Sequence, residues 1–382
     1  MKSFVYFVTA LCVFALASCG GGGGGGSSDD SDMDGTSITT TSTTTTTLSS
    51  GTGSNAGTSR MEVVELGTGT SFTLPSDVIS FVVSAFGEVS SFVGFAALTN
   101  PNGEDLFITG NYPLAAYDLA LVAESYGNVL VPMVTDHAAM AGEWNFQYYQ
   151  GTNDVKLTMR TGSTPTSSVL KIKPYLTGTQ YSVSDVEGAL AILKNIYEKA
   201  GLQVELDTVS VLSDSKFQAV SSDFNNIITS EMVSMGSADR INLFFIEDFS
   251  GEDAGTLGIA AGIPGSLGIA SNRNGVLNSL EAHVLGGALD TQLLGETVAH
   301  EMGHFIGLFH PTEKNGVTFD PLADTAECSI SMASSALAGP QPSDCIGFGG
   351  ENLMFWQGDP SIDQTSLTSD QVHIINYSPV AK

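Results

Sequence analysis

The sequence predicts a multidomain protein in which an N-terminal β-sandwich precedes an α/β (α+β) domain. Short apolar runs separated by turn signals fill residues 61–166, a pattern typical of antiparallel sheets. Strand-like and helix-like runs alternate through residues 167–382, which indicates an α/β fold. Residues 19–60 are mostly Gly, Ser, Asp and Thr and contain nothing that can form a core, so we expect a disordered tether there.

The first 18 residues have the pattern of an export signal. Lys2 precedes an apolar run, Phe4 to Ala17, that is too short to span a membrane. The run ends in Leu-Ala-Ser before Cys19, which resembles a bacterial lipobox, where cleavage precedes a cysteine that then carries lipid. We therefore expect a lipoprotein signal peptide over residues 1–18. The lipid on Cys19 would anchor an exported protein to a bacterial membrane, at the outer membrane or the cell surface. The alternative is an ordinary secretory peptide with an incidental cysteine.

Composition restricts the partners. The chain has 13 Lys and Arg against 41 Asp and Glu, a formal net charge of −28. Such a field repels phosphate backbones, so we expect no nucleic-acid partner. The acidity either keeps an exported protein soluble or favours cationic peptides. After the signal peptide and Cys19 are set aside, Cys328 and Cys345 remain of the four cysteines. In an oxidising compartment we expect them to form a disulfide, the alternative being two free thiols.

The elements follow from apolar periodicity. Strands are predicted at residues 72–74, 78–83, 144–149, 155–159, 169–175, 204–212 and 241–246. A capping box at Ser184–Glu187 predicts the start of a helix that ends at Gly201, and a second helix is predicted over 217–235. Residues 267–270 are either an edge strand that pairs with an extended peptide or an ordinary loop.

Three histidines near residue 300 have the spacing of metal ligands. Asp290 or Thr291 is suited to begin a helix through His300 and His304, which lie four residues apart and therefore on one face. Gly307 permits a left-handed turn that ends the helix, and the returning chain brings His310 to the same point. Three imidazoles with a fourth position left open are the arrangement of a catalytic zinc site.

Glu301 follows the first of these histidines and is the candidate general base, placed to take a proton from water at the zinc. The full H-E-x-x-H-x-x-G-x-x-H pattern has a chance expectation of about 10⁻⁵ per chain of this composition. It resembles the metzincin metallopeptidases, and within them the pappalysin/cytophagalysin type. The resemblance implies a zinc-dependent endopeptidase that hydrolyses protein or peptide substrates with one catalytic Zn²⁺.

Residues after the zinc motif extend the resemblance. Asn352-Leu353-Met354 is similar to the family's Met-turn, which implies that Met354 is an apolar floor beneath the ligands. Trp356 stands where relatives usually have tyrosine, so an oxyanion-side role would fall to an indole that can donate a hydrogen bond but cannot ligate zinc. Ca²⁺ in some relatives makes Asp320 and Asp324 candidate calcium ligands, the alternative being solvated turn carboxylates.

Two other functions compete with the endopeptidase. One is a surface-anchored binding lipoprotein with a vestigial zinc site, although a binding protein has no need of the base Glu301. The other is a different zinc hydrolase whose third ligand is a downstream glutamate such as Glu327. The remaining histidines lack ligand spacing and are expected to be surface or packed side chains: His137, His283 and His373.

Overall fold

The computed structural model describes residues 45–47, 60–88, 92–107, 122–124, 126–149, 151–165 and 168–382. The predicted signal peptide, the lipidation site Cys19 and nearly all of the predicted tether lie outside these residues. No helix within the described ranges is both long and apolar enough to cross a membrane.

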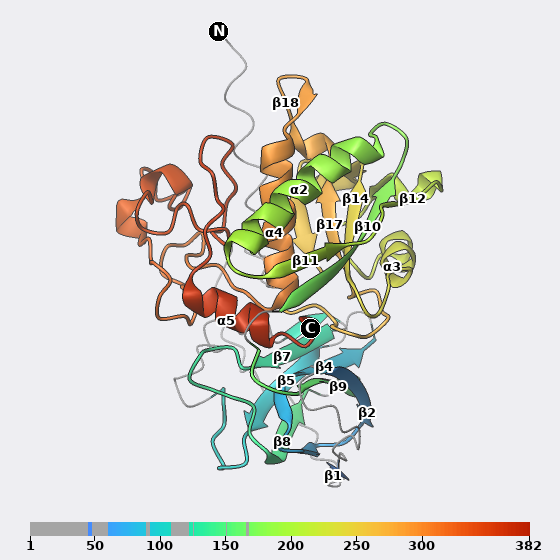
Figure 1. Ribbon diagram of the computed structural model, residues 1–382, viewed down its shortest axis with the longest axis vertical. Helices are drawn as coiled ribbons and strands as arrows, with labels where there is room; N and C mark the ends of the chain where they lie inside the picture. Colours follow the sequence, from blue (N-terminus) through green and yellow to red (C-terminus); the bar gives the residue numbers. More distant parts are fainter. Residues whose placement is uncertain are drawn as a thin grey trace, which may run out of the picture.

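The first half of the chain forms two sheets, in the lower part of Figure 1. One is fully antiparallel and contains, in spatial order, β2 (Arg60–Gly67), β9 (Thr152–Thr161), β4 (Val78–Gly87) and β7 (Tyr126–Val131). The other contains β1 (Thr45–Thr47), β3 (Ser71–Leu74), β8 (Gly142–Tyr148), β5 (Phe92–Thr99) and β6 (Val122–Glu124), and is antiparallel except for the β1–β3 pair. Phe72 and Trp144 of the second sheet meet Phe81 of the first edge-on, at centroid distances of 5.5 and 4.9 Å. The two sheets therefore share an apolar core.

The second half is built on a sheet with the strand order β11-β10-β14-β17-β16. Its strands are β10 (Val169–Thr177), β11 (Gln203–Leu206), β12 (Ser210–Leu212), β14 (Ile241–Ile246), β16 (Gly258–Ala260) and β17 (Val276–Ser279). All pairs are parallel except that between β17 and the edge strand β16. The single strand predicted over 204–212 is two short strands, β11 and β12, which both pair with β10.

The central strand β14 is buried on both faces, as its continuous apolar run predicts. Leu243 and Phe245 belong to the core shared with α2 (Val183–Lys199) and α4 (Thr291–Ile306). Phe244 and Ile246 belong to a second core shared with α3 (Ile227–Ser234). Helices α2 and α4 lie side by side over one face of the sheet in Figure 1. The chain is thus a mixed α/β protein.

Side-chain caps place the helix starts differently from the sequence prediction. Ser182 and Asp185 form the capping box of α2, two residues before the predicted one. The helix predicted over 217–235 begins only at Ile227, because the Asn226 side chain accepts the N–H groups of Ile228 and Thr229. Of the two alternatives for residues 267–270, the structure shows the loop, since those residues form a turn and bend while β16 occupies the edge.

Short elements and one terminal helix complete the described chain. The helix α5 (Ser369–Tyr377) begins at a capping box of Thr368 and Gln371. The shorter strands and 3₁₀ turns are η2 (Ser215–Phe217), β13 (Ala219–Val220), β15 (Asp248–Phe249), η3 (Gly251–Asp253), η4 (Glu281–His283), β18 (Val284–Leu285), β19 (Ala288–Leu289), η5 (Ile330–Met332) and η6 (Pro342–Asp344).

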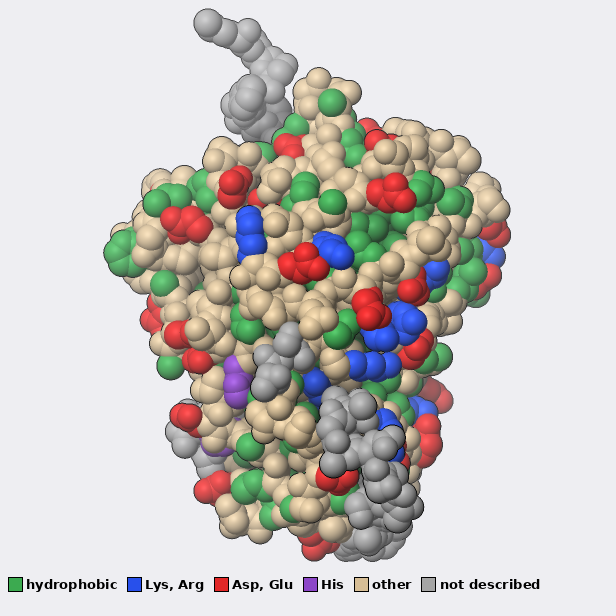
Figure 2. All heavy atoms as spheres, in the orientation of Figure 1, with side chains coloured by type: hydrophobic (Ala, Val, Ile, Leu, Met, Phe, Trp, Pro, Cys, Tyr) green, Lys and Arg blue, Asp and Glu red, His purple; other side chains and the backbone are tan. Residues whose placement is uncertain are grey.

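A buried arginine joins the two halves. Arg160 of β9 is 1% exposed, and its guanidinium donates to the backbone carbonyls of Asn376 and Ser378 at the C-terminal end of α5. Burial lowers the pKa of Arg160 to about 10. On the face shown in Figure 2, most of the Lys and Arg side chains lie near Asp and Glu side chains.

Candidate metal centre

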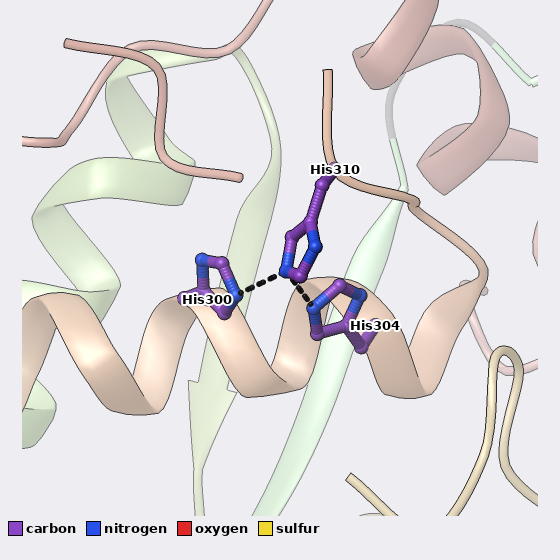
Figure 3. Close-up of side chains that lie close together, drawn as sticks. All are labelled: His300, His304 and His310. Atoms are coloured by element: carbon purple, nitrogen blue, oxygen red, sulfur yellow. Dashed lines mark hydrogen bonds between the residues drawn. The ribbon is translucent and has the colours of Figure 1, made fainter. Parts of the chain in front are cut away.

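The three predicted ligands converge on one point (Figure 3). His300 and His304 project from the same face of α4, and His310 returns from the chain beyond the helix. The Nε2 atom of His310 lies 2.9 Å from Nε2 of His304 and 3.3 Å from Nε2 of His300. Asp290 caps the helix by accepting the N–H of Leu293 at 3.0 Å. The structure therefore brings together the residues that the spacing predicted.

The outer nitrogen of each ring is held by an acceptor. His300 Nδ1 is 2.7 Å from the carbonyl oxygen of Leu353, and His304 Nδ1 is 2.7 Å from that of Leu308. His310 Nδ1 is 3.0 Å from Oε1 of Glu313. A carbonyl can only accept, so these contacts place the ring proton on Nδ1 and leave the Nε2 lone pairs directed at each other. Lone pairs this close require a shared proton or a cation between them, and three neutral imidazoles are a donor set that suits zinc.

Burial keeps the first two rings neutral. It lowers the pKa of His300 to about 3 and that of His304 well below its ordinary value, and the neighbouring His310 adds to both effects. At His310 burial also acts to lower the pKa, but the Glu313 carboxylate and other acidic groups outweigh it, so the net direction is upward. Neutral rings are the form that binds a metal.

The carboxylate of Glu301 lies between the histidines and the edge strand β16. The backbone N–H of Ala260 in β16 hydrogen bonds to it. A Cβ at Gly258 would lie 2.7 Å from Cγ of Glu301, so only glycine fits there. Burial raises the pKa of Glu301 to about 7, against the opposing effect of His310. Glu301 thus faces the same cleft as the ligands, beside a strand edge that has a partner on one side only.

Met354 packs against α4. It is fully buried, and a Cβ on Gly303 of the helix would overlap its Sδ. The Asn352 side chain accepts the Met354 N–H at 2.8 Å and exchanges two hydrogen bonds with Gln371 of α5. This segment therefore packs Met354 against Gly303 of α4 and, through the Leu353 carbonyl, orients His300.

The indole of Trp356 lies at the cleft but its N–H is already used. Nε1 donates to the carbonyl of Pro340 at 2.7 Å. The oxyanion-side role considered for this N–H therefore lacks a free donor. The other residues lining the cleft come from α4, from β16 and the residues that flank it, from the segment after His310, and from residues 353–364: Thr256, Leu257, Gly258, Ile259, Ile263, Leu293, Glu296, Thr297, Glu313, Leu353, Gly358 and Gln364.

Cys328 and Cys345 form the predicted disulfide, with Cα atoms 5.8 Å apart, packed with Phe355 and Trp356.

The structure does not support calcium binding at Asp320. Asp320 accepts hydrogen bonds from the Thr325 hydroxyl and the Leu322 N–H, so it acts as a turn carboxylate. In the described part of the chain, the histidine trio is the one group of three or more candidate side-chain ligands.

The sequence did not point to two side chains that support the site. Glu313 follows His310 by three residues, and that spacing was the available signal for the carboxylate that holds the His310 ring. The spacing of His283 assigns it no role, yet it is fully buried behind α4, with Nε2 3.0 Å from the hydroxyl of the cleft residue Thr297 and Nδ1 2.6 Å from the Ser279 carbonyl. Nothing in the local sequence around His283 indicates that contact.

The second half of the chain has the features of a metallopeptidase-like domain. A helix over a mixed sheet carries two histidines, and a glycine turn after the helix brings back a third. Residues 183–311 match the family model described as Metallo-peptidase family M12B Reprolysin-like. The matched segment runs from the start of α2 to just beyond His310, and the cluster of three histidines within it points to a zinc site. No curated protein sequence is significantly similar to the chain.

Two solved metallopeptidase structures are similar to parts of the chain. Metalloproteinase-II from Bacteroides fragilis has 9% identity and a TM-score of 0.32, over 59% of this chain and 62% of that one. Archaemetzincin from Methanopyrus kandleri has 16% identity and a TM-score of 0.25, over 38% of this chain and 78% of that one. The chain thus spans less than two thirds of the length of the Bacteroides fragilis protein. At TM-scores below 0.5 neither structure informs the function of this chain.

Proposed function

We propose that the chain is a zinc-dependent endopeptidase with His300, His304 and His310 as zinc ligands and Glu301 as general base. The observation that carries the proposal is the convergence of three Nε2 lone pairs whose rings are each fixed from behind. The family match over residues 183–311 supports the same reading.

Each step of peptide hydrolysis can be assigned to residues of this chain. A zinc ion held by the trio would supply a Lewis acid that polarises the scissile carbonyl and acidifies a water. Glu301 takes the proton from the attacking water and then gives it to the leaving amine. The Ala260 N–H donates to that carboxylate, and the lack of a side chain at Gly258 leaves room for it beside β16. An extended peptide can lie along this strand.

The finer assignments are also proposals. The subtype is the pappalysin/cytophagalysin one, on the residues from His300 to Met354. The location is an exported, lipid-anchored position at the outer membrane or cell surface of a bacterium, on the pattern of residues 1–18 and Cys19. The proposed divisions of the chain are a signal peptide over residues 1–18, a tether over 19–60, a β-sandwich over 61–166 and the metzincin-like domain over 167–382.

The test replaces Glu301 by Gln, which removes the base and leaves the ligands. Wild-type protein, the Glu301→Gln variant and a Glu187→Gln control, changed at an exposed position of α2, are each incubated with an unstructured protein and assayed for bound zinc. We expect zinc in all three, cleavage by wild type and control, and a loss of at least about 10²-fold in the variant.

Each other outcome points elsewhere. Full activity in Glu301→Gln overturns the assignment of the base. Zinc binding without any turnover by wild type favours the surface binding protein with a vestigial site. Zinc affinity that is unchanged when His310 is replaced favours a different third ligand such as Glu327.

A further inference from the structure

The turn that follows α4 serves two of the three ligands. Gly307 has a φ of +118°, and its N–H donates to the carbonyls of Gly303 and His304. The next residue, Leu308, supplies the carbonyl that holds the His304 ring, and the chain then leads to His310. A small displacement of this turn therefore moves both His304 and His310.

Strand β7 of the first half of the chain lies directly against this turn. Leu130 is fully buried, and a Cβ at Gly307 would lie only 2.5 Å from its Cδ2 atom. A methyl group of Leu130 thus occupies the space that a side chain at Gly307 would need. In Figure 1 the lower end of α4, together with α5, lies above β7.

A second contact runs from β7 to the last turn of the same helix. Asn128 is 2% exposed, and its Nδ2 donates to the carbonyl of Pro264 at 2.5 Å. The N–H of the adjacent Gly265 donates to the carbonyl of Phe305 in α4 at 2.9 Å. Two hydrogen bonds therefore connect β7 with the end of α4, beside the direct contact of Leu130.

The alternation of side chains shows that these contacts belong to one face of the sheet. Successive residues of a strand point to opposite faces. Leu130 pairs with Val82, which pairs with Thr158, and the Thr158 hydroxyl donates to the Leu267 carbonyl of the second half. Leu157 is one residue away and so points to the opposite face.

We propose that β7 of the N-terminal sheets is a structural support of the metal site, with Leu130 and Asn128 as positioning residues for the turn that orients His304 and delivers His310. The N-terminal half is then required for tight metal binding, beyond any role as a spacer. This inference rests on the proposed zinc site but not on the peptidase reaction.

The test compares two identical truncations in the full chain. Leu130→Ala removes the contact with Gly307, whereas Leu157→Ala makes the same change in the same sheet on the other face. Zinc affinity is measured by competition with a chromophoric chelator, at a temperature where circular dichroism shows each variant folded. We expect Leu130→Ala to weaken zinc binding at least about tenfold and Leu157→Ala less than about twofold.

Two results would overturn the inference: wild-type zinc affinity in Leu130→Ala, or equal weakening in both variants, which would indicate general destabilisation. If Leu130→Ala does not fold, Leu130→Val removes a single carbon at the same contact and is compared with Leu157→Val. There, a selective loss of about threefold supports the inference, and equal affinities overturn it. Wild-type protein that binds no zinc refutes the proposed function itself.

Discussion

Replacing Glu313 tests how much the metal site depends on the one side-chain acceptor that supports it. His300 and His304 are held by backbone carbonyls, which no substitution removes, whereas His310 is held by a carboxylate at 3.0 Å. The two side chains are only 6% and 20% exposed, so solvent screens this pair weakly. Loss of such a partner costs about 10- to 100-fold in metal affinity, which is about 1.4–2.7 kcal/mol.

We expect Glu313→Ala to weaken zinc binding within that range and Glu313→Gln to weaken it less, because the amide oxygen still accepts from Nδ1 but carries no charge. The assay is chelator competition at about pH 7.5, with the exposed Glu187→Ala as the control. Zinc affinity of Glu313→Ala within about twofold of wild type would refute the reasoning that this carboxylate orients the third ligand.

Three further predictions concern the helix crossing, the indole and the substrate. Gly295→Ala should lower the free energy of unfolding, because its Cβ would lie 2.6 Å from Cβ of Ile192 and overpacking of about 1–3 kcal/mol outweighs a gain of about 1 kcal/mol in helix propensity. Urea unfolding that shows a stabilised variant would contradict this. Trp356→Phe should lower stability by about 1 kcal/mol through loss of the bond to Pro340, but lower kcat by less than about tenfold, and a loss of 10²-fold or more, typical of an oxyanion donor, would restore that role. Three glutamates line the cleft, and none of its described lining residues is Lys or Arg. A peptide with Lys beside the cleaved bond should therefore have a higher kcat/KM than the same peptide with Glu there. The reverse order would show that the carboxylates do not face the substrate.

The candidate site was predictable because its core is local in sequence. The spacing of His300 and His304 sets their common face on a helix, and Gly307 with its left-handed turn sets the return to His310. The continuous apolar run at 241–246 likewise indicated a strand covered on both faces. In each case the sequence pattern and the structure that it predicts lie within one short segment, so the prediction does not depend on contacts between distant residues.

The features that the sequence did not predict depend on local capping or on distant contacts. The helix expected over 217–235 has apolar spacing, but the Asn226 side chain binds the N–H groups of the residues after it and fixes the start there. The sequence leaves residues 267–270 open between an edge strand and a loop, whereas the edge strand is β16, because pairing with β17 decides which short apolar segment becomes a strand. Periodicity does not report such pairing.

The motif therefore specifies which side chains converge at the candidate metal site, but not how firmly they are held. His300 is oriented by Leu353, His304 by Leu308 and His310 by Glu313, and the turn at Gly307 is backed by Leu130 from a strand much earlier in the chain. A peptide with the same motif has the ligands without these supports, so it must lose conformational entropy on binding that the folded chain has already lost. Metal affinity is on this argument a property of the whole fold, which is why contacts remote from the cleft are the informative sites to change.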